Sequence, residues 1–359
     1  MRITSLEAIP YALPFERPYV TARGRLERRE MVLVRLRTDE GPEGVGEAVP
    51  LSLRGGGASL ETVLRELREP VASALIGADP LDSRFATSPV SGAISAPTAA
   101  AVEVARLDLA AKLAGVPLWR VLGAASAGPV ECNATLVAGP PRAVAADAER
   151  WLERGFSTFK LKVGVPGDVG QVEAVRAEVG AQARIRVDAN GVWSPEEAVI
   201  RLTAMERHGL ELAEQPAEDL EGLAVVRSQT AVPIAADESV ASPEDAGRAV
   251  AAGACQLATA KLVKAGGIEP VRRIAAQLPV YLSSALDGPV GIAAAAHAAQ
   301  ALRDEGVLAP VAQGLATQLL FADTVASIEC EMYDGLLRVP DGPGLGVEID
   351  EAALERHRL

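Results

Sequence analysis

From about residue 130 onward, short β-like runs alternate with helical stretches at a regular interval. The runs start about 22 to 30 residues apart, which is the length of one strand–loop–helix–loop unit. Eight such units in succession favour a closed parallel barrel over an open sheet. The eighth run is the weakest, because the helix expected after it near Thr317–Ser327 is short. The runs cover 131–138, 158–164, 184–190, 210–216, 233–239, 256–262, 279–285 and 308–314.

The chain before this repeat has a mixed α and β pattern. Three strand-like runs, of which the last two read as a hairpin, precede two helical patterns. The predicted strands are Ile3–Leu13, Met31–Leu36 and Val45–Val49, the helices are Leu60–Ile76 and Thr98–Ala114, and the connecting loops are Glu16–Arg29 and Leu51–Ala58. The second loop carries Arg54 followed by three glycines, a composition typical of a mobile lid.

These patterns predict an α/β protein with three parts. Residues 1–125 form an α+β capping domain, and residues 126–327 form a (β/α)8-type, modified TIM barrel. Residues 328–359 are too rich in Gly and Pro for a ninth unit, so we expect them to form a tail that returns to complete the capping domain.

Composition excludes several classes of function. With 48 acidic and 35 basic residues, the formal net charge of −13 disfavours binding to nucleic acid or to an anionic membrane surface. The N-terminal residues lack the pattern of a signal peptide, and the most apolar later stretch, 291–302, is too short to cross a bilayer. The three cysteines are far apart and odd in number, which suits a reducing compartment. We therefore expect a soluble cytoplasmic protein.

Charged residues recur where the barrel strands end. Lys162, Asp188, Glu214, Asp237 and Lys261 close five successive runs and follow one another at intervals of 23 to 26 residues, about one unit each. Side chains at the carboxyl ends of barrel strands converge on one mouth, where barrel enzymes place their chemistry. A buried charge is costly unless it is paired or bound to a metal, so this recurrence predicts an active site.

The three carboxylates come from adjacent strands and are expected to meet at one point. An all-oxygen set without His or Cys suits a hard cation, so Asp188, Glu214 and Asp237 predict a Mg²⁺ site, with Mn²⁺ as an alternative.

The lysines are predicted to flank that site. Lys162 and Lys261 come from the second and sixth strands, which lie opposite one another in a ring of eight, and Lys160 shares a face with Lys162. Close ammonium groups depress each other's pKa, so Lys162 is expected to be poised as a base with a pKa of about 7–8. This arrangement suits removal of a proton from the carbon next to a carboxylate, with the metal stabilising the resulting enediolate.

Each of these residues also has a structural interpretation. A single Asp or Glu at a strand end is commonly a helix N-cap, and a lone lysine commonly extends along the surface. Asn190 is either a neighbour of the metal ligands or a turn residue before a glycine, Glu238 either reaches the mouth or caps a helix, and Lys264 reads as a loop residue. Capping alone does not account for five charges at one-unit spacing, so the joint site is favoured.

At this point the chain resembles the enolase superfamily, in particular its muconate-lactonizing-enzyme subgroup, and it is also similar to mandelate racemase. The resemblance spans nearly the whole chain and includes the N-terminal domain. It rests on Lys160-Leu161-Lys162, Asp188–Trp193, Glu214-Gln215-Pro216, Asp237-Glu238-Ser239 and the lysine before a Gly-Gly loop, Lys261 with Gly266-Gly267.

The resemblance implies an enzyme that forms an enediolate from a small carboxylate substrate. The segments 283–295 and 313–325 look most like o-succinylbenzoate synthases, which implies a carbon–oxygen lyase of menaquinone biosynthesis with Lys162 as base and then acid. The alternative is an isomerase: a muconate cycloisomerase, an N-acylamino acid racemase or a dipeptide epimerase. Gln313-Gly314-Leu315 departs from the Asp-x-Asp pair usual in dipeptide epimerases, which disfavours that reaction.

The remaining expectations concern substrate contacts and assembly. Arg23, in a loop that covers the substrate in the family, and Ser284 are candidate substrate residues, together with Asn190 and Glu238. Arg25, Arg28 and Arg29 fit equally well on a solvated basic face. By analogy with relatives, we expect a homo-oligomer. A non-catalytic descendant of the family is disfavoured because all five charged positions are present.

Overall fold

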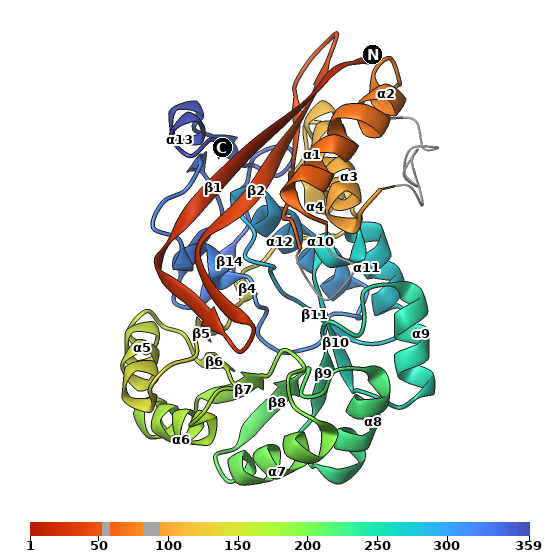
Figure 1. Cartoon of the computed structure of the whole chain (residues 1–359). Helices are drawn as coiled ribbons and strands as arrows, with labels where there is room; N and C mark the ends of the chain where they lie inside the picture. The colour runs from red at the N-terminus through yellow and green to blue at the C-terminus, as the bar shows by residue number, and fades with distance from the viewer. Residues whose placement is uncertain (52–57, 82–93) are drawn as a thin grey trace.

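The computed structural model describes residues 1–51, 58–81 and 94–359, so the predicted glycine-rich lid around Arg54 lies outside the described residues. The molecule is an α/β barrel with an N-terminal capping domain (Figure 1). A long ribbon of β1 and β2 runs from the cap down to the barrel (Figure 1).

The barrel wall is a parallel sheet of seven strands in the order β11-β10-β9-β8-β7-β6-β5. These strands are short and nearly all their residues are buried, because helices cover one face and side chains fill the other. The strands are β5 (Ala134–Leu136), β6 (Thr158–Lys162), β7 (Arg184–Asp188), β8 (Leu210–Glu214), β9 (Ile234–Ala236), β10 (Leu257–Ala260) and β11 (Val280–Leu282).

The eighth position of the barrel holds isolated bridges in place of a strand. Gln313 pairs with Cys132 on one side, and Gly314 pairs with Ser283 on the other, so residues 313 and 314 join the two edges of the sheet. The chain then enters a single 3-10 helix, η3 (Ala316–Leu320). The predicted eight-unit barrel with a weak last unit is therefore confirmed.

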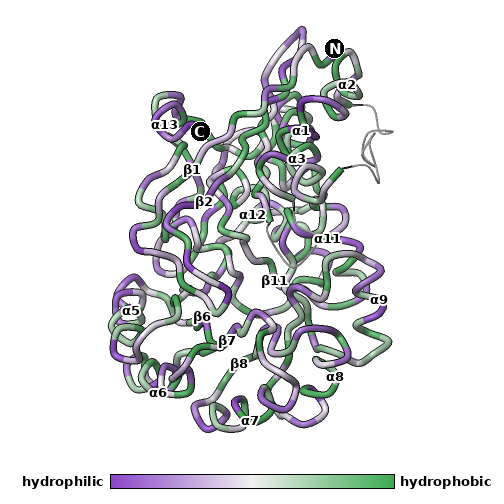
Figure 2. Tube along the Cα trace, in the orientation of Figure 1, coloured by the Kyte–Doolittle hydropathy of each residue, from purple (hydrophilic) through white to green (hydrophobic). Residues whose placement is uncertain are grey.

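The outer helices begin with local signals that the sequence contains. Ser194, Asp219 and Ser242 each accept a hydrogen bond from a backbone N–H in the first turn of the helix that follows. Figure 2 shows hydrophilic and hydrophobic residues alternating along the helices α5 to α9, whereas α12 is buried over most of its length. The helices are α5 (Pro141–Glu153), α6 (Asp168–Val179), α7 (Pro195–Glu206), α8 (Leu220–Gln229), α9 (Pro243–Ala251), α10 (Leu262–Ala265), α11 (Ile268–Ala275) and α12 (Pro289–Asp304).

The cap combines a three-stranded antiparallel sheet with helices. Its strands are β1 (Ile3–Thr21), β2 (Gly24–Thr38) and β3 (Gly44–Ala48). The predicted loop Glu16–Arg29 was wrong, because β1 and β2 continue through it as a ribbon that turns at residues 22 and 23. Pairing across the ribbon satisfies backbone groups that a loop would expose to water.

The helices of the cap follow the prediction with one difference. The predicted helix over 60–76 divides into α1 (Leu60–Glu66), a π-helical turn (Leu67–Val71) and α2 (Ala72–Leu75), because Pro70 interrupts the helical hydrogen bonds. The helix α3 (Ala96–Leu113) packs on β3 so closely that a Cβ on Gly46 would overlap the carbonyl oxygen of Ala101. A short helix, α4 (Leu118–Val121), then leads to the barrel.

The C-terminal segment contacts both parts of the molecule. The backbone N–H of Leu359 donates to Pro10 O at 3.0 Å, and Ala12 donates to His357 O at 2.9 Å, so the tail lies along β1. The segment contains β12 (Ala326–Ile328), β13 (Glu331–Tyr333), β14 (Leu336–Arg338), β15 (Glu348–Ile349) and α13 (Glu351–Arg356), and β14 also pairs with β4 (Val130–Glu131). The division of the chain at residues 125 and 327 stays a prediction. Among the described residues, no helix has the length and apolar character needed to span a membrane.

Candidate active site

The predicted charged residues lie side by side at one end of the barrel strands. In the sheet register Lys162 of β6 pairs with Asp188 of β7, which pairs with Glu214 of β8. Asp237 directly follows β9 and Lys261 directly follows β10. Because parallel strands end at the same edge, these five side chains surround one mouth.

Lysine ammonium groups lie between the carboxylates in this mouth. The Lys160 ammonium bridges Asp188 at 2.9 Å and Glu214 at 2.7 Å, and Lys162 donates to Asp188 at 2.6 Å. The hydroxyl of Tyr281, from the far strand β11, donates to Glu214. The side chains are almost fully buried, so these contacts replace the water that the charges lose.

Asp237 is held by two lysines, one of which the sequence prediction missed. Lys261 approaches one carboxylate oxygen at 2.5 Å, and Lys264 approaches the other at 2.7 Å. Lys264, predicted to be a loop residue, is buried in the one-turn helix α10 and also donates to Thr259 O at 3.0 Å. Its spacing of three residues from Lys261, which puts both on one side of a helical turn, was the available signal.

An outer group of predicted residues contacts this set. Lys162 donates to Asn190 Oδ1 at 3.2 Å, and the Asn190 amide donates to Glu238 at 3.3 Å. Arg23, at the tip of the β1–β2 ribbon, lies 3.7 Å from Glu238 and donates to the backbone oxygen of Asn190 at 3.0 Å. Glu238 therefore reaches the mouth, and Ser242, not Glu238, caps the following helix.

Ser284 has different neighbours. Its hydroxyl accepts from the backbone of Asp287 at 2.8 Å and from the Thr317 hydroxyl at 2.7 Å, so it ties the loop after β11 to η3. Its predicted role in substrate contact stays a prediction.

Gln215 positions two strand ends, a role the sequence did not indicate. Its side-chain oxygen accepts from the backbone N–H of Asp237 at 2.8 Å, and its amide donates to Ala217 O at 2.8 Å. Gln215, Asn190 and Leu286 all have positive φ, of 40°, 48° and 66°, and all lie just after barrel strands. Such backbone conformations are costly for residues other than glycine and collect at functional sites.

The pairing sets the pKa values in the mouth. Burial lowers the pKa of Lys162, but the nearby acidic groups, Asp188 first and then Tyr19 and Glu214, together outweigh it and raise the pKa above the ordinary lysine value. The expected pKa of about 7–8 for Lys162 is therefore wrong for this arrangement, because its nearest neighbour is a carboxylate rather than only a second ammonium. Burial, followed by the Asp188 charge, raises the pKa of Glu214 to about 7.

The carboxylates of the mouth suit a hard divalent cation, although in this structure lysine ammonium groups lie between them. Within the residues the structure describes, no three His, Cys, Asp or Glu side chains lie close enough together to hold a metal as they stand. Asp188, Glu214 and Asp237 nevertheless supply only oxygen ligands from three neighbouring strand ends. A divalent cation would compete with Lys160 for two of these carboxylates. The ligand set stays a prediction.

Two further arginines of the described chain have buried guanidinium atoms, and the first of them differs from its expected place. Arg29, predicted to lie on a solvated face, has a buried Nε atom without a hydrogen-bond partner, and burial lowers its pKa. Arg186 is fully buried inside the barrel, where it lies over the Tyr281 ring and donates to Ala312 O at 2.9 Å. Arg186 is two residues before Asp188 on β7, and this strand periodicity was the signal for its inward direction. By contrast, Arg25 and Arg28 pair with neighbouring glutamates on the surface, as expected.

Comparison with known families agrees with this architecture. Residues 5–123 match the mandelate racemase / muconate lactonizing enzyme N-terminal domain, and residues 143–353 match the enolase C-terminal domain-like family. The chain belongs to the enolase superfamily, in its muconate-lactonizing-enzyme subgroup.

Individual relatives are similar over nearly their whole length. The chain is 33% identical to the L-Ala-D/L-Glu epimerase of Bacillus subtilis (strain 168), with 97% of each protein covered. It is 31% identical to muconate cycloisomerase 1 of Pseudomonas putida, over 99% of this chain and 98% of the relative. The crystal structure of a dipeptide epimerase from Enterococcus faecalis V583, complexed with Mg and the dipeptide L-Leu-L-Tyr, superposes with a TM-score of 0.90 at 29% identity, over 97% of this chain and all of that one.

These relatives bear on the two predicted reactions. All three are isomerases by name, so they support the predicted isomerase alternative better than the predicted lyase. They contain nothing specific to o-succinylbenzoate synthase, and the predictions of dehydration and of a place in menaquinone biosynthesis gain no support from them.

Proposed function

We propose that this enzyme is a racemase or epimerase that inverts the α-carbon of an N-acylated amino acid, a class that includes the carboxyl-terminal residue of a dipeptide. The observation that carries the proposal is the position of Lys162 and Lys261. They stand at the ends of β6 and β10, four positions apart around a ring of eight. Inversion requires a proton acceptor on one side of the α-carbon and a donor on the other, which two opposed lysines supply.

Each lysine is held by its own carboxylate, so each has a defined direction. Lys162 is fixed by Asp188 at 2.6 Å and Lys261 by Asp237 at 2.5 Å. In one direction Lys162, in its deprotonated form, takes the α-proton, and the ammonium of Lys261 gives a proton to the opposite side of the same carbon. The Asp188 carboxylate disfavours that deprotonated form, and a divalent cation on Asp188 would favour it. In the reverse direction the two lysines exchange roles. Lys160, between Asp188 and Glu214, adds positive charge beside the substrate carboxylate.

We assign Mg²⁺ to Asp188, Glu214 and Asp237, with Mn²⁺ as the alternative. When bound, such an ion supplies a positive charge that stabilises the negative charge formed on the substrate carboxylate oxygens as the proton leaves. The donor chemistry of the three carboxylates supports this assignment, as does the magnesium in the structure of the Enterococcus relative.

Dehydration and cycloisomerisation do not require both lysines to transfer protons. Either reaction can proceed with one lysine as base and acid, which leaves the second as a source of charge only. The epimerase relatives and the two firmly oriented lysines both favour the two-base reaction.

The experiment is incubation in D₂O with Mg²⁺ and a panel of N-acyl amino acids, dipeptides, muconate and the cyclohexadiene precursor of o-succinylbenzoate. We expect deuterium at the α-carbon together with inversion, measured by proton NMR and chiral chromatography. Efficient turnover of the cyclohexadiene or of muconate, with acylated amino acids left unchanged, would contradict the proposal.

A further inference from the structure

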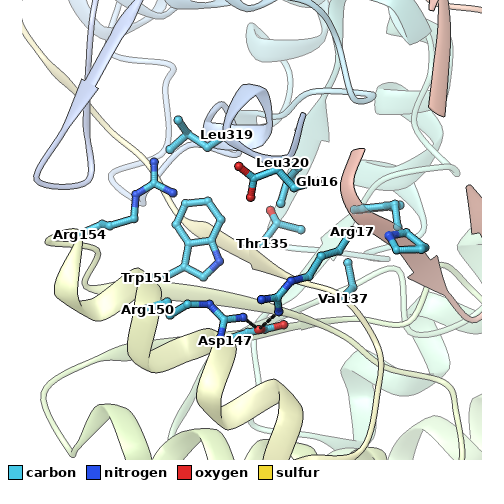
Figure 3. A pocket seen from close by; sticks show the side chains of 12 residues that line it. Glu16, Arg17, Thr135, Val137, Asp147, Arg150, Trp151, Arg154, Leu319 and Leu320 are labelled. Atoms are coloured by element: carbon cyan, nitrogen blue, oxygen red, sulfur yellow. Dashed lines mark hydrogen bonds and ion pairs between the residues drawn. The ribbon is translucent and has the colours of Figure 1, made fainter. Parts of the chain in front are cut away.

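Lysine is rare in this chain and is concentrated at the mouth. The sequence has 30 arginines and five lysines. Four of the five lie at the mouth: Lys160, Lys162, Lys261 and Lys264. On the surface beside α5, by contrast, Arg17 and Arg150 share the carboxylate of Asp147, as the dashed lines in Figure 3 show. The mouth therefore uses a compact ammonium with three donors where the chain otherwise uses the planar guanidinium.

The proposed reaction uses three of these lysines and leaves Lys264 without a role. Lys264 is buried, and its ammonium donates only to other groups of the protein. It contacts Asp237 Oδ1 at 2.7 Å and Thr259 O at 3.0 Å, and it also donates to the backbone oxygen of Asp237. An ammonium has three N–H bonds, so these three acceptors leave none for a substrate. Lys264 is therefore a fixed positive charge.

The backbone that carries Lys264 is anchored to the cap. The one-turn helix α10 ends at Gly266, and a Cβ on the next residue, Gly267, would overlap the carboxylate of Glu103. The same carboxylate accepts hydrogen bonds from the backbone N–H groups of Ile268 and Glu269. Because α3 holds the chain directly after α10, Lys264 has little freedom to leave Asp237.

The contact with Lys264 distinguishes the two carboxylate oxygens of Asp237. Oδ1 is bound by Lys264, whereas Oδ2 is contacted by Lys261, which the proposed reaction brings to the substrate. The Gln215 side chain accepts from the backbone N–H of Asp237 at 2.8 Å and holds the residue from a second direction. Oδ2 is therefore the oxygen that Asp237 can offer to a cation.

We propose that Lys264 is a positioning residue that matches the charge of the metal site to a divalent ion and keeps Asp237 Oδ1 out of the ligand set. The inference rests on the proposed assignment of Mg²⁺, and not on the racemase reaction. The three carboxylates carry three negative charges, and Lys264 cancels one of them. The nearby Glu238 lies 3.7 Å from Arg23, so this pair adds no net charge. The other three lysines serve the substrate, which leaves two negative charges for the ion.

The test compares the binding of Mn²⁺ and Lu³⁺, two ions of similar size and different charge, to the wild type and to Lys264→Met. Loss of the positive charge favours the trivalent ion more than the divalent one, because the repulsion grows with the charge of the ion. A looser Asp237 affects both ions, so the ratio of their affinities isolates the effect of charge. In Lys264→Met the preference for Lu³⁺ over Mn²⁺ should rise at least about tenfold, measured by competition against the EPR signal of Mn²⁺.

Lys112→Met is the matched control, because Lys112 also contacts a buried aspartate, Asp108, at 2.7 Å, but lies on α3 in the cap. It should leave the ratio of affinities unchanged. Lys264→Arg keeps the charge and loses the three-donor geometry, so its ratio should stay near the wild-type value even if both ions bind more weakly. An unchanged ratio in Lys264→Met, or an equal rise in Lys112→Met, would overturn the inference.

A second measurement needs no variant. In a crystal structure of the wild type with Mn²⁺, Lys264 should keep its contact with Asp237 Oδ1 while the ion binds Oδ2. An ion bound to both oxygens, or a Lys264 turned away from Asp237, would overturn the inference. A wild type that binds neither ion contradicts the Mg²⁺ assignment and this inference together. A wild type that binds Mn²⁺ but turns over no acylated amino acid contradicts the proposed reaction alone.

Discussion

Two groups of buried carboxylates in this molecule are satisfied in opposite ways. At the barrel mouth, Asp188 and Asp237 each contact two lysine ammonium groups. At the contact between cap and barrel, Glu47 of β3 is buried and has no ion pair with another described residue; it accepts from the Tyr11 hydroxyl at 2.7 Å and from the backbone of Gly288 at 2.6 Å. The first group is built to stay ionised and the second to hold a proton.

The pKa values express this difference. Burial by itself raises the pKa of a carboxyl group at either place. At Asp188, however, Lys160 and Lys162 reverse this effect and lower the pKa below the ordinary value. At Glu47, burial first and then the charge of Asp287 raise the pKa to about 7, and no described lysine or arginine pairs with the carboxylate to reverse this. Burial likewise raises the pKa of Glu103, on α3, to about 7, while its carboxylate accepts backbone hydrogens at the start of α11. Asp188 and Asp237 are kept ionised and are available to a metal, whereas Glu47 and Glu103 serve the packing of two domains. Glu214 is the exception at the mouth, because burial raises its pKa to about 7 as well.

The largest expected effect concerns metal at the mouth. Removal of divalent ions with EDTA should abolish racemisation, by at least about 100-fold, because the charge formed on the substrate carboxylate then lacks its main stabiliser. Activity is measured by chiral chromatography before chelation, after it, and after addition of excess Mg²⁺. Full activity in EDTA would contradict the assignment of Asp188, Glu214 and Asp237 as ligands.

A smaller effect is expected for Glu47→Gln at the contact between cap and barrel. An acid whose pKa is raised on folding stabilises the folded state below its unfolded value of 4.5, and this stability is lost as the pH rises towards 7. The variant should therefore resemble the wild type at pH 4.5 and exceed its free energy of unfolding by about 2 to 3 kcal/mol at pH 8. Urea unfolding at both pH values measures this difference.

Glu103→Gln is the matched comparison for that variant, because Glu103 has a similar pKa but lies in a different contact. The wild type should lose stability between pH 4.5 and pH 8. Glu47→Gln and Glu103→Gln should each make this loss smaller, and the double variant should make it smaller than either single variant does. If the Glu47→Gln protein is less stable than the wild type at pH 8, ionisation of Glu47 does not reduce the free energy of unfolding, and the account of this carboxyl group is contradicted.

The smallest effect is expected for Tyr11→Phe. This change removes the hydroxyl that donates to Glu47 and leaves the carboxylate with fewer donors. We expect a loss of about 1 kcal/mol in the free energy of unfolding at pH 8, with kcat unchanged, because within the described residues the Tyr11 hydroxyl bonds Glu47 and not the lysines of the mouth. A loss of activity without a loss of stability would mean that the two groups of carboxylates are coupled.

Much of the mouth could be predicted because its signal repeats along the chain. Successive members of the set are about one barrel unit apart. The same periodicity therefore predicts the barrel and predicts that these side chains lie next to one another: Lys162, Asp188, Glu214, Asp237 and Lys261. The same periodicity does not reveal which charges pair. Lys264 and Tyr281 bind Asp237 and Glu214 through distances that depend on a helical turn and on the closure of the ring.

The cap and the closure of the barrel were harder to predict because their contacts join distant segments. Nothing near Glu47 in the sequence indicates Gly288, which lies 241 residues later. The segment from Glu16 to Arg29 is rich in arginine and contains a proline and a glycine, so it reads as a loop until pairing of β1 with β2 is known. Likewise, the eighth segment pairs with β5 through a single bridge at Gln313, which is a property of the closed ring rather than of any short segment.

The two-base reaction can be tested most directly by following α-proton exchange in D₂O with each enantiomer of one N-acyl amino acid separately. Lys162→Ala and Lys261→Ala should both lose racemisation, by at least about 1000-fold. Each variant should still exchange the α-proton of one enantiomer, and the two variants should retain opposite enantiomers. If Lys261→Ala exchanges both enantiomers at the wild-type rate, or if Lys162→Ala still racemises normally, the account of two opposed lysines is contradicted.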